Sequence, residues 1–220
     1  MSITEIKELL RSYAHSAALV MSYVVSVRAL TIATRFKNRL MWYSLRRRFR
    51  RVGENSFIEF PAVTLGEEYI TIGSHLSCYA RLRLEAYAKH LENEYQPTII
   101  IGDHVSLNYD CHIACINRVE IGDHVLIGSK VHITDHFHGE VNRTAILVPP
   151  AQRKLISRGP VIIRNNVWIG EGVVVMPNVT IGENAIIGAN AVVTHDIPAN
   201  CVAAGVPARV IRNLFEEQTK

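Results

Sequence analysis

The feature that most limits how this 220-residue chain can fold is an apolar repeat with a step of six residues. One row places Val, Ala or Ile at every sixth position, and a second row keeps the same step two places later. The first row is Val161, Val167, Val173, Val179, Ala185, Ala191 and Ile197, and the second is Ile163, Ile169, Val175, Ile181, Ile187 and Val193. Neither a helical period of about 3.6 nor a strand period of about 2 produces this step.

The repeat predicts a mainly β fold, a left-handed parallel β-helix. A six-residue step is a short strand plus a corner, and three such sides close a coil of about 18 residues. Successive coils stack about 4.8 Å apart through backbone hydrogen bonds, with small aliphatic side chains inside. Gly and Asn at the corners accept backbone angles that other residues resist. The same double row recurs in residues 70–84 and 99–133, so we expect the β-helix domain to span residues 53–213.

Two stretches interrupt the repeat, at residues 85–98 and 135–160. Long excursions from a rigid scaffold are common places for binding and catalysis. The second excursion begins inside the segment "VHITDHFHGE", which holds His132, His136 and His138. We expect His132 to point outward from a side of the coil, and we expect the functional site near the start of this excursion.

A basic N-terminal arm, residues 1–52, precedes the β-helix. Residues 1–53 hold eleven Lys and Arg against two Glu, about +9, whereas the rest holds thirteen against eighteen acids, about −5. Residues 3–41 contain no Gly or Pro and repeat apolar side chains at helical intervals, so we expect helices. The apolar stretch 17–27 is too short to predict a membrane span, and the acidic residues near the start do not fit a signal peptide.

The arm ends in a run of arginines at residues 46–51. This run fits a solvated helix face or a peripheral contact with anionic lipid headgroups. Nucleic-acid binding is not expected, because no recognition fold accompanies the run. The four cysteines show no CxxC pair, which fits reduced core residues of a cytoplasmic protein. We therefore expect a cytoplasmic location, with a peripheral position at the inner face of the cell membrane left open, and a short C-terminal tail at 214–220.

The segment "NNVWIGEGVVVMPNVTIGENAIIGANAVVTHDIPANCVAAGVPARVI" resembles the C-terminal half of the hexapeptide-repeat O-acetyltransferases. That family includes the galactoside, maltose and nodulation acetyltransferases and enzymes that modify lipopolysaccharide and capsule. The segment "ITDHFHGE" is similar to one typical of the surface-polysaccharide branch. The resemblance covers residues 53–213. It implies a homotrimeric, acetyl-CoA-dependent O-acetyltransferase acting on a sugar hydroxyl in lipopolysaccharide, capsule or exopolysaccharide biosynthesis.

The resemblance also implies roles for individual residues. His136 stands where the family keeps its general base, and Asn108 stands where an Asn contacts the acceptor. We expect His138 and Asp135 to belong to the acceptor site as well, with Asp135 able to orient an imidazole. The residues that match coenzyme A contacts are Trp168, Ala189, Thr194, Arg209 and Arg212. Two positions depart from the family pattern: Glu171 replaces a small residue, and His195 replaces a common Lys.

A histidine base also follows from the chemistry of acetyl transfer. An alcohol near pH 7 is a poor nucleophile, and a neutral imidazole, with an ordinary pKa of about 6.5, can accept its proton. No Ser or Cys stands in a recognisable nucleophile motif, so we expect direct transfer without an acyl-enzyme.

Three other functions are compatible with the sequence. N-acetylation of an amino sugar would use the same base. A γ-class carbonic anhydrase has the same fold and binds zinc through three histidines, for which His112, His132 and His136 are candidates, whereas the acetyltransferase requires no metal. A scaffold held at the membrane by the basic arm would not bind acetyl-CoA.

Overall fold

The computed structural model describes residues 2–23, 25–140 and 142–215. The chain forms two compact units, Met1–Met41 and Trp42–Lys220. The expected N-terminal helices are α1 (Ile3–Ser22) and α2 (Val27–Leu45). Ser2 caps α1, because its hydroxyl accepts from the Glu5 N–H while the Glu5 carboxylate accepts from the Ser2 N–H.

No single helix among the described residues has both the length and the apolar character needed to cross a membrane. The two helices α1 and α2 reach the required length and apolar character only when they are taken together as a bent pair.

The second unit begins within α2, before the arm boundary expected at residue 52. Trp42 and Phe49 are buried in the core of this unit. The Trp42 ring lies 6.1 Å from the Phe49 ring and 6.4 Å from the Phe57 ring. The last turn of α2 and the arginine run therefore belong to the compact body that contains the β-helix.

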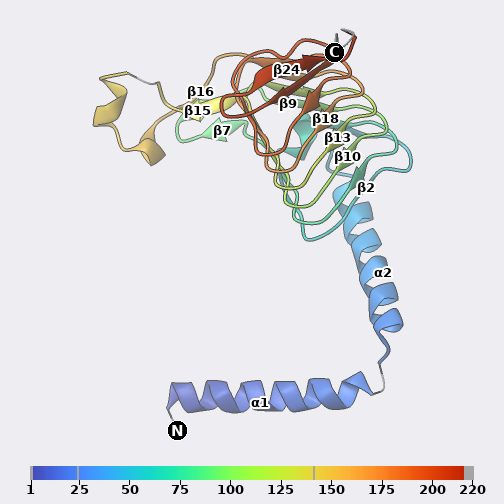
Figure 1. Ribbon diagram of the computed structural model, residues 1–220. Helices are drawn as coiled ribbons and strands as arrows, with labels where there is room; N and C mark the ends of the chain where they lie inside the picture. Colours follow the sequence, from blue (N-terminus) through green and yellow to red (C-terminus); the bar gives the residue numbers. More distant parts are fainter. Residues whose placement is uncertain (1, 24, 141, 216–220) are drawn as a thin grey trace. The chain divides into compact units, whose positions relative to one another are not determined.

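The body is a left-handed parallel β-helix, and in its described residues three sheets run along the sides of the prism (Figure 1). The first sheet holds β1 (Arg51–Val52), β4 (Ile70–Ile72), β9 (Thr98–Ile101), β12 (Arg118–Ile121), β17 (Val161–Ile163) and β20 (Val179–Ile181). The second holds β2 (Phe57–Ile58), β5 (Ser77–Cys78), β10 (Ser106–Leu107), β13 (Leu126–Ile127), β18 (Trp168–Ile169), β21 (Ile186–Ile187), β23 (Cys201–Ala204) and β24 (Arg209–Asn213). The third holds β3 (Val63–Leu65), β6 (Arg83–Ala86), β11 (His112–Cys115), β14 (His132–Thr134), β19 (Val174–Val175) and β22 (Val192–Val193). Neighbouring strands are parallel except β24, which runs antiparallel to β23.

The two apolar rows fill the interior of the prism. Strand register stacks equivalent residues of successive coils, for example Ile121 on Ile163 and Ile163 on Ile181. These three side chains are at most 1% exposed, as are Ile133 and Val175 on the third sheet. Burying one such side chain contributes about 1.5–3 kcal/mol, so the stacked rows are a main source of the stability of the β-helix.

The corners use the left-handed backbone at the asparagines, as predicted, but not at glycines such as Gly182. A glycine stands there because a Cβ would collide with the backbone of Ala199 on the next coil. Asn166 and Asn184 have φ angles of 59° and 58° at one corner, and His104 has 56° at an equivalent place on an earlier coil. Asn tolerates this conformation better than most residues. The exposed ring of His104 stacks between those of His75 and His124, at centroid distances of 4.5 and 4.8 Å.

Both excursions leave the third sheet. The first departs after Ala86, because Glu85 and Ala86 still pair with β11, and it folds into the hairpin of β7 (Lys89–His90) and β8 (Asn93–Glu94). The second contains β15 (His136–His138), which pairs antiparallel with β16 (Leu155–Ser157). The short 3-10 turns are η1 (Glu67–Tyr69), η2 (Ala145–Leu147) and η3 (Pro150–Gln152). Of the expected C-terminal tail, residues 216–220 lie outside the described residues.

Candidate active site

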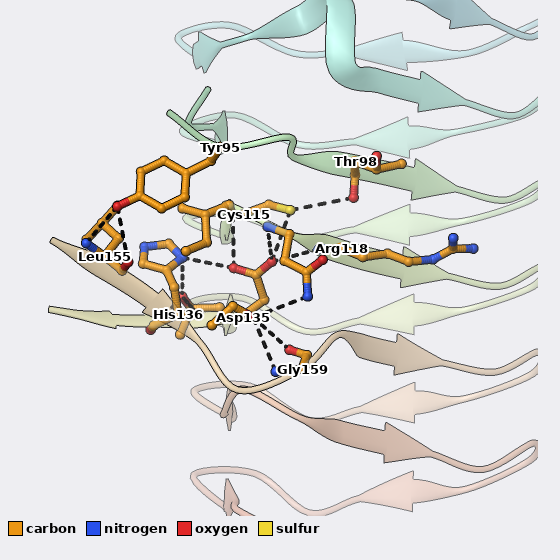
Figure 2. Close-up of polar contacts among 12 residues, drawn as sticks. Tyr95, Thr98, Cys115, Arg118, Asp135, His136, Leu155 and Gly159 are labelled. Carbon is orange, nitrogen blue, oxygen red and sulfur yellow. Dashed lines mark hydrogen bonds and ion pairs between the residues drawn. The ribbon is translucent and has the colours of Figure 1, made fainter. Parts of the chain in front are cut away.

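A cleft of about 390 Å³ opens where the excursions leave the third sheet. Its lining comes from β6, β11 and β14 and from both excursions. The lining residues are Arg83, Tyr87, His90, His112, Ala114, His132, Thr134, His136, His138 and Leu155. One hydroxyl joins the two excursions, because Tyr95 donates to the Leu155 carbonyl at 3.1 Å and accepts from its N–H at 3.0 Å (Figure 2).

A buried carboxylate, Asp135, lies behind this cleft and is fully shielded from solvent. It accepts hydrogen bonds from three successive backbone N–H groups on the preceding coil, those of Ile116 at 2.9 Å, Asn117 at 2.7 Å and Arg118 at 2.8 Å. The Cys115 thiol donates a fourth at 3.2 Å (Figure 2). The coil turns a corner here, so its N–H groups point at one place and form a ready anion site.

The hydrogen bonds decide the charge of Asp135. Burial alone would raise the pKa of this carboxyl, but the hydrogen bonds from His136 and from the backbone of Ile116 and Asn117 outweigh it and hold the pKa below its ordinary value. Burial, reinforced by the Asp135 carboxylate, raises the pKa of the Cys115 thiol. At neutral pH Asp135 is therefore an anion, and Cys115 is a neutral donor rather than a thiolate nucleophile.

His136 projects from the first position of β15, directly beside this anion. Its Nδ1 lies 3.0 Å from Asp135 Oδ1 and 3.2 Å from the Thr134 hydroxyl. The side chain is 8% exposed, and the Tyr87 ring packs edge-on at 6.0 Å. An ionised carboxylate can only accept, so Nδ1 carries the hydrogen and Nε2 is the basic nitrogen. Within the described part of the chain no group hydrogen-bonds Nε2, and the ring borders the cleft.

A second polar cluster lies on the third sheet, where Arg83, His112 and His132 line the cleft and Glu85 lies beside them without lining it. Glu85 is 7% exposed and accepts from Arg83 at 2.9 Å, and its carboxylate lies 2.8 Å from His112 Nε2. Burial raises the pKa of Glu85, but these two neighbours outweigh it and lower the net value. The His132 ring lies 4.6 Å from the His112 ring.

The two neighbouring imidazoles of this cluster, His112 and His132, are neutral near pH 7. Burial, then the neighbouring His112 and His136, lowers the pKa of His132 to about 4. Burial also lowers the pKa of His112, although the Glu85 hydrogen bond opposes it. The sequence singled out the histidines but not Arg83 or Glu85. In "RLE", charged residues stand on either side of an apolar one, so both charged side chains leave the same face of the strand. That alternation is the signal that could have indicated Arg83 and Glu85.

The structure brings together some, but not all, of the predicted catalytic and acceptor-binding residues. His136 and His138 line the cleft, and Asp135 lies behind it in contact with His136. The His138 ring is 5.9 Å from that of His90. Burial and the neighbouring His136 lower the pKa of His138. Asn108 lies at the turn after β10 and does not line the cleft.

The residues matched to coenzyme A contacts lie elsewhere on the same chain. Trp168 is 52% exposed on β18 of the second sheet. Ala189 is exposed at the corner after β21, and Thr194 follows β22, with its hydroxyl 2.9 Å from His195 Nδ1. Arg209 and Arg212 are exposed on β24. None of them lines the cleft of their own chain.

The unusual Glu171 has a partner. Lys130 Nζ lies 3.2 Å from Glu171 Oε1 at the exposed corner before β19, so the carboxylate does not present an isolated negative charge. Such an exposed pair contributes little to stability.

No metal centre is formed by the three candidate zinc ligands within one chain. His112 and His132 pack ring to ring, and His136 Nδ1 is held by Asp135. Across the described ranges, no three His, Cys, Asp or Glu side chains are grouped so that they could hold a metal ion.

A left-handed β-helix built from six-residue repeats is the fold of the hexapeptide-repeat transferases. Residues 160–195 match the family described as "Bacterial transferase hexapeptide (six repeats)". WbbJ of Escherichia coli K12, whose name assigns it to O-acetyl transfer in lipopolysaccharide biosynthesis, is 38% identical over 167 residues, covering 74% of this chain and 81% of WbbJ. The chain therefore belongs to the hexapeptide-repeat acetyltransferase family, and it is an acyltransferase.

Two further relatives agree with this membership. The galactoside O-acetyltransferase of the same organism is 35% identical over 171 residues, covering 76% of this chain and 64% of its own. A hexapeptide-repeat acetyltransferase of Vibrio cholerae O1 biovar eltor, solved with acetyl coenzyme A, superposes with a TM-score of 0.55 at 26% identity, covering 79% of this chain and 76% of that one. These findings confirm the fold and the family that the sequence predicts.

Proposed function

We propose that this protein transfers the acetyl group of acetyl-CoA to a sugar hydroxyl in the biosynthesis of a surface polysaccharide such as lipopolysaccharide. The observation that carries the proposal is the buried, ionised Asp135 holding His136 at the edge of a polar cleft. The similarity to WbbJ supports the acceptor class, and the relative solved with acetyl coenzyme A supports the donor.

In the proposed reaction, His136 acts as the general base. Nε2 takes the proton of the acceptor hydroxyl as its oxygen attacks the thioester carbonyl carbon, and the Asp135 carboxylate stabilises the imidazolium that forms. The tetrahedral intermediate then collapses, the C–S bond breaks, and the coenzyme A thiolate takes the proton from Nε2. The products are the acetyl ester and coenzyme A, so no group on the enzyme is acylated. Two features support direct transfer: the Cys115 thiol has a raised pKa, and no other nucleophile motif is present in the sequence.

A homotrimer with active sites between subunits is part of the proposal. Trp168, Ala189, Thr194, Arg209 and Arg212 are our proposed contacts to coenzyme A, and they do not line the cleft of their own chain. The sides of a β-helix prism are flat and repetitive, which suits packing of one chain against the next. A neighbouring chain could then carry the donor to this cleft, and Asn108 could reach the acceptor in the same way.

The acetyl-transfer step can be tested with purified protein, acetyl-CoA and a panel of sugars and lipid-linked saccharides. We expect coenzyme A release that depends on a hydroxyl acceptor, with a product whose acetyl group is lost in mild alkali, as an ester is. An alkali-stable product formed only from amino sugars would indicate N-acetylation instead. Protein that does not bind acetyl-CoA would favour the scaffold function, and stoichiometric zinc with CO₂ hydration would favour the carbonic anhydrase.

Glu85 is our proposed positioning residue for the acceptor on the third sheet. Glu85 does not line the cleft itself, but its carboxylate accepts from Arg83 and lies 2.8 Å from His112 Nε2, so it orients two side chains that do. Glu85→Gln should raise KM for the acceptor by about tenfold, because it weakens the charge-assisted hydrogen bonds that orient Arg83 and His112. Steady-state kinetics should show little change in kcat or in KM for acetyl-CoA. A matched control is Glu120→Gln, which removes a carboxylate that pairs with Arg118 away from the cleft. If Glu85→Gln and Glu120→Gln changed KM for the acceptor equally, Glu85 would not be positioning the acceptor site.

A further inference from the structure

The helix α1 has two sharply different faces. Its apolar residues recur three and four positions apart and so lie on one side, whereas Lys7, Arg11 and His15 lie along one border of that side. The apolar side consists of Ile3, Ile6, Leu9, Leu10, Tyr13, Ala14, Ala17, Val20 and Met21. Every residue of α1 is exposed, and Leu10 and Tyr13 are 63% and 68% exposed. Such a wide, uncovered apolar face marks an interaction site.

The exposed part of α2 repeats this arrangement with positive charge. Ile32, Phe36 and Leu40 follow one another at intervals of four residues and form an exposed apolar stripe. Arg28, Arg35 and Arg39 run beside this stripe, and Lys37 lies on its other side. Residues 27–41 contain these four basic side chains and no acidic one.

We infer that α1 and α2 bind the surface of an anionic phospholipid bilayer, with their apolar faces in the boundary between headgroups and acyl chains. An amphipathic helix with basic residues on the polar face lies in the plane of the membrane in this way. Each basic side chain near an anionic surface adds about 1 kcal/mol of attraction. The inference concerns the arm alone and does not depend on the acetyl-transfer reaction.

The positive charge of α2 indicates that the partner of its apolar stripe is an anionic membrane rather than a second copy of the arm. Pairing two copies through the α2 stripe would bring rows of arginine together, because the stripe is flanked by basic residues and has no acidic ones to pair with them. Anionic headgroups remove this repulsion. The exposed Tyr13 also fits an interfacial position, since tyrosine carries an apolar ring and a polar hydroxyl.

The inference can be tested with full-length protein and sedimented vesicles. We expect binding to phosphatidylcholine vesicles that contain phosphatidylglycerol and much weaker binding to pure phosphatidylcholine. Salt on the order of 1 M should release the protein, because the screening length falls to about 3 Å. Sodium phosphate and sodium chloride of equal ionic strength should act alike. Specific release by phosphate would instead indicate a phosphate-binding site.

Two aspartate variants distinguish the contribution of the apolar face to vesicle binding from the contribution of net charge. Leu10→Asp places a carboxylate in the apolar face, and Ser12→Asp adds the same charge to the polar side of the same helix. Leu10→Asp should lower the vesicle partition coefficient at least about tenfold more than Ser12→Asp, because it also removes a Leu side chain that the bilayer would bury. Equal melting curves by circular dichroism would show that the β-helix stays folded in both.

Four results would overturn the inference. The first is a full-length protein that ignores anionic vesicles at low salt, and the second is equal loss in the two aspartate variants. The third is a protein that resists both high salt and alkaline extraction, because a segment that spans the bilayer would behave in that way. Fourth, if Leu10→Asp lowers the oligomeric mass in the absence of lipid, the partner of α1 is a second copy of the arm.

Discussion

Replacing His136 with asparagine should lower kcat for the true acceptor by about 10²–10⁴-fold, the loss expected when a positioned general base is removed. Asparagine keeps some hydrogen bonding at this position, but it cannot take the proton of the acceptor hydroxyl as imidazole does. Steady-state kinetics with acetyl-CoA and the acceptor measure the change. The dissociation constant of coenzyme A, measured by calorimetry, should barely change. The proposed donor contacts lie on β18, on β24 and at the corners near β21 and β22, which the substitution does not alter.

The neighbouring histidine provides the control for this assignment. His138 lies on the same strand, two residues further along, and it is more exposed than His136. His138→Asn should cost much less than His136→Asn, and mainly in KM, if His138 only touches the acceptor. An active His136→Asn enzyme together with an inactive His138→Asn enzyme would move the base to residue 138.

The β-helix could be predicted because its rules are local. Each six-residue step carries its own interior residue and its own corner, so Val173, Val175 and Asn190 already indicate where the backbone turns and which side chains face inward. Consecutive coils repeat these rules without a long connection between residues 161 and 197. The fold follows from counting residues, and the structure confirms both apolar rows.

The candidate site could be predicted only in part, because its contacts join different coils across the excursions. His136 was recognisable from the segment that contains it. The anion site behind it depends on backbone N–H groups at residues 116–118, which carry no side-chain signal. Glu85 meets His112 across the first excursion, where the six-residue count is broken, so their register could not be counted. The roles proposed for Trp168 and the C-terminal arginines stay predictions.

Replacing Asp135 with asparagine should have a comparable effect on catalysis. The amide can turn its NH₂ toward His136 Nδ1, which would then have to accept. The ring hydrogen would move to Nε2, leaving no lone pair for the acceptor proton. The imidazolium formed during the reaction would also lose its neighbouring anion. We expect kcat to fall on the order of 10²–10⁴-fold, measured at a temperature where circular dichroism shows the variant folded.

The same substitution should destabilise the protein. Three N–H groups and one thiol now donate to an ionised carboxylate, whereas asparagine offers a single neutral oxygen. Losing charge-assisted hydrogen bonds at a fully buried site should lower the free energy of unfolding by about 3 kcal/mol at pH 7. Urea denaturation of wild type and variant measures this difference. As a control, Asp103→Asn alters a carboxylate that accepts from the Ser74 N–H at an exposed corner, and it should cost far less.

The dependence of this stability difference on pH tests the charge of Asp135 directly. Because the folded-state pKa lies below its ordinary value of 3.8, the carboxylate stabilises the folded protein above that pH. The contribution is lost as pH falls through the folded-state pKa. The gap between wild type and Asp135→Asn should therefore stay constant from pH 8 to about 5 and shrink below about pH 4. A gap that already closes between pH 7 and 6 would mean that Asp135 is protonated in the folded enzyme, and an acid at that position could not hold His136 as the base.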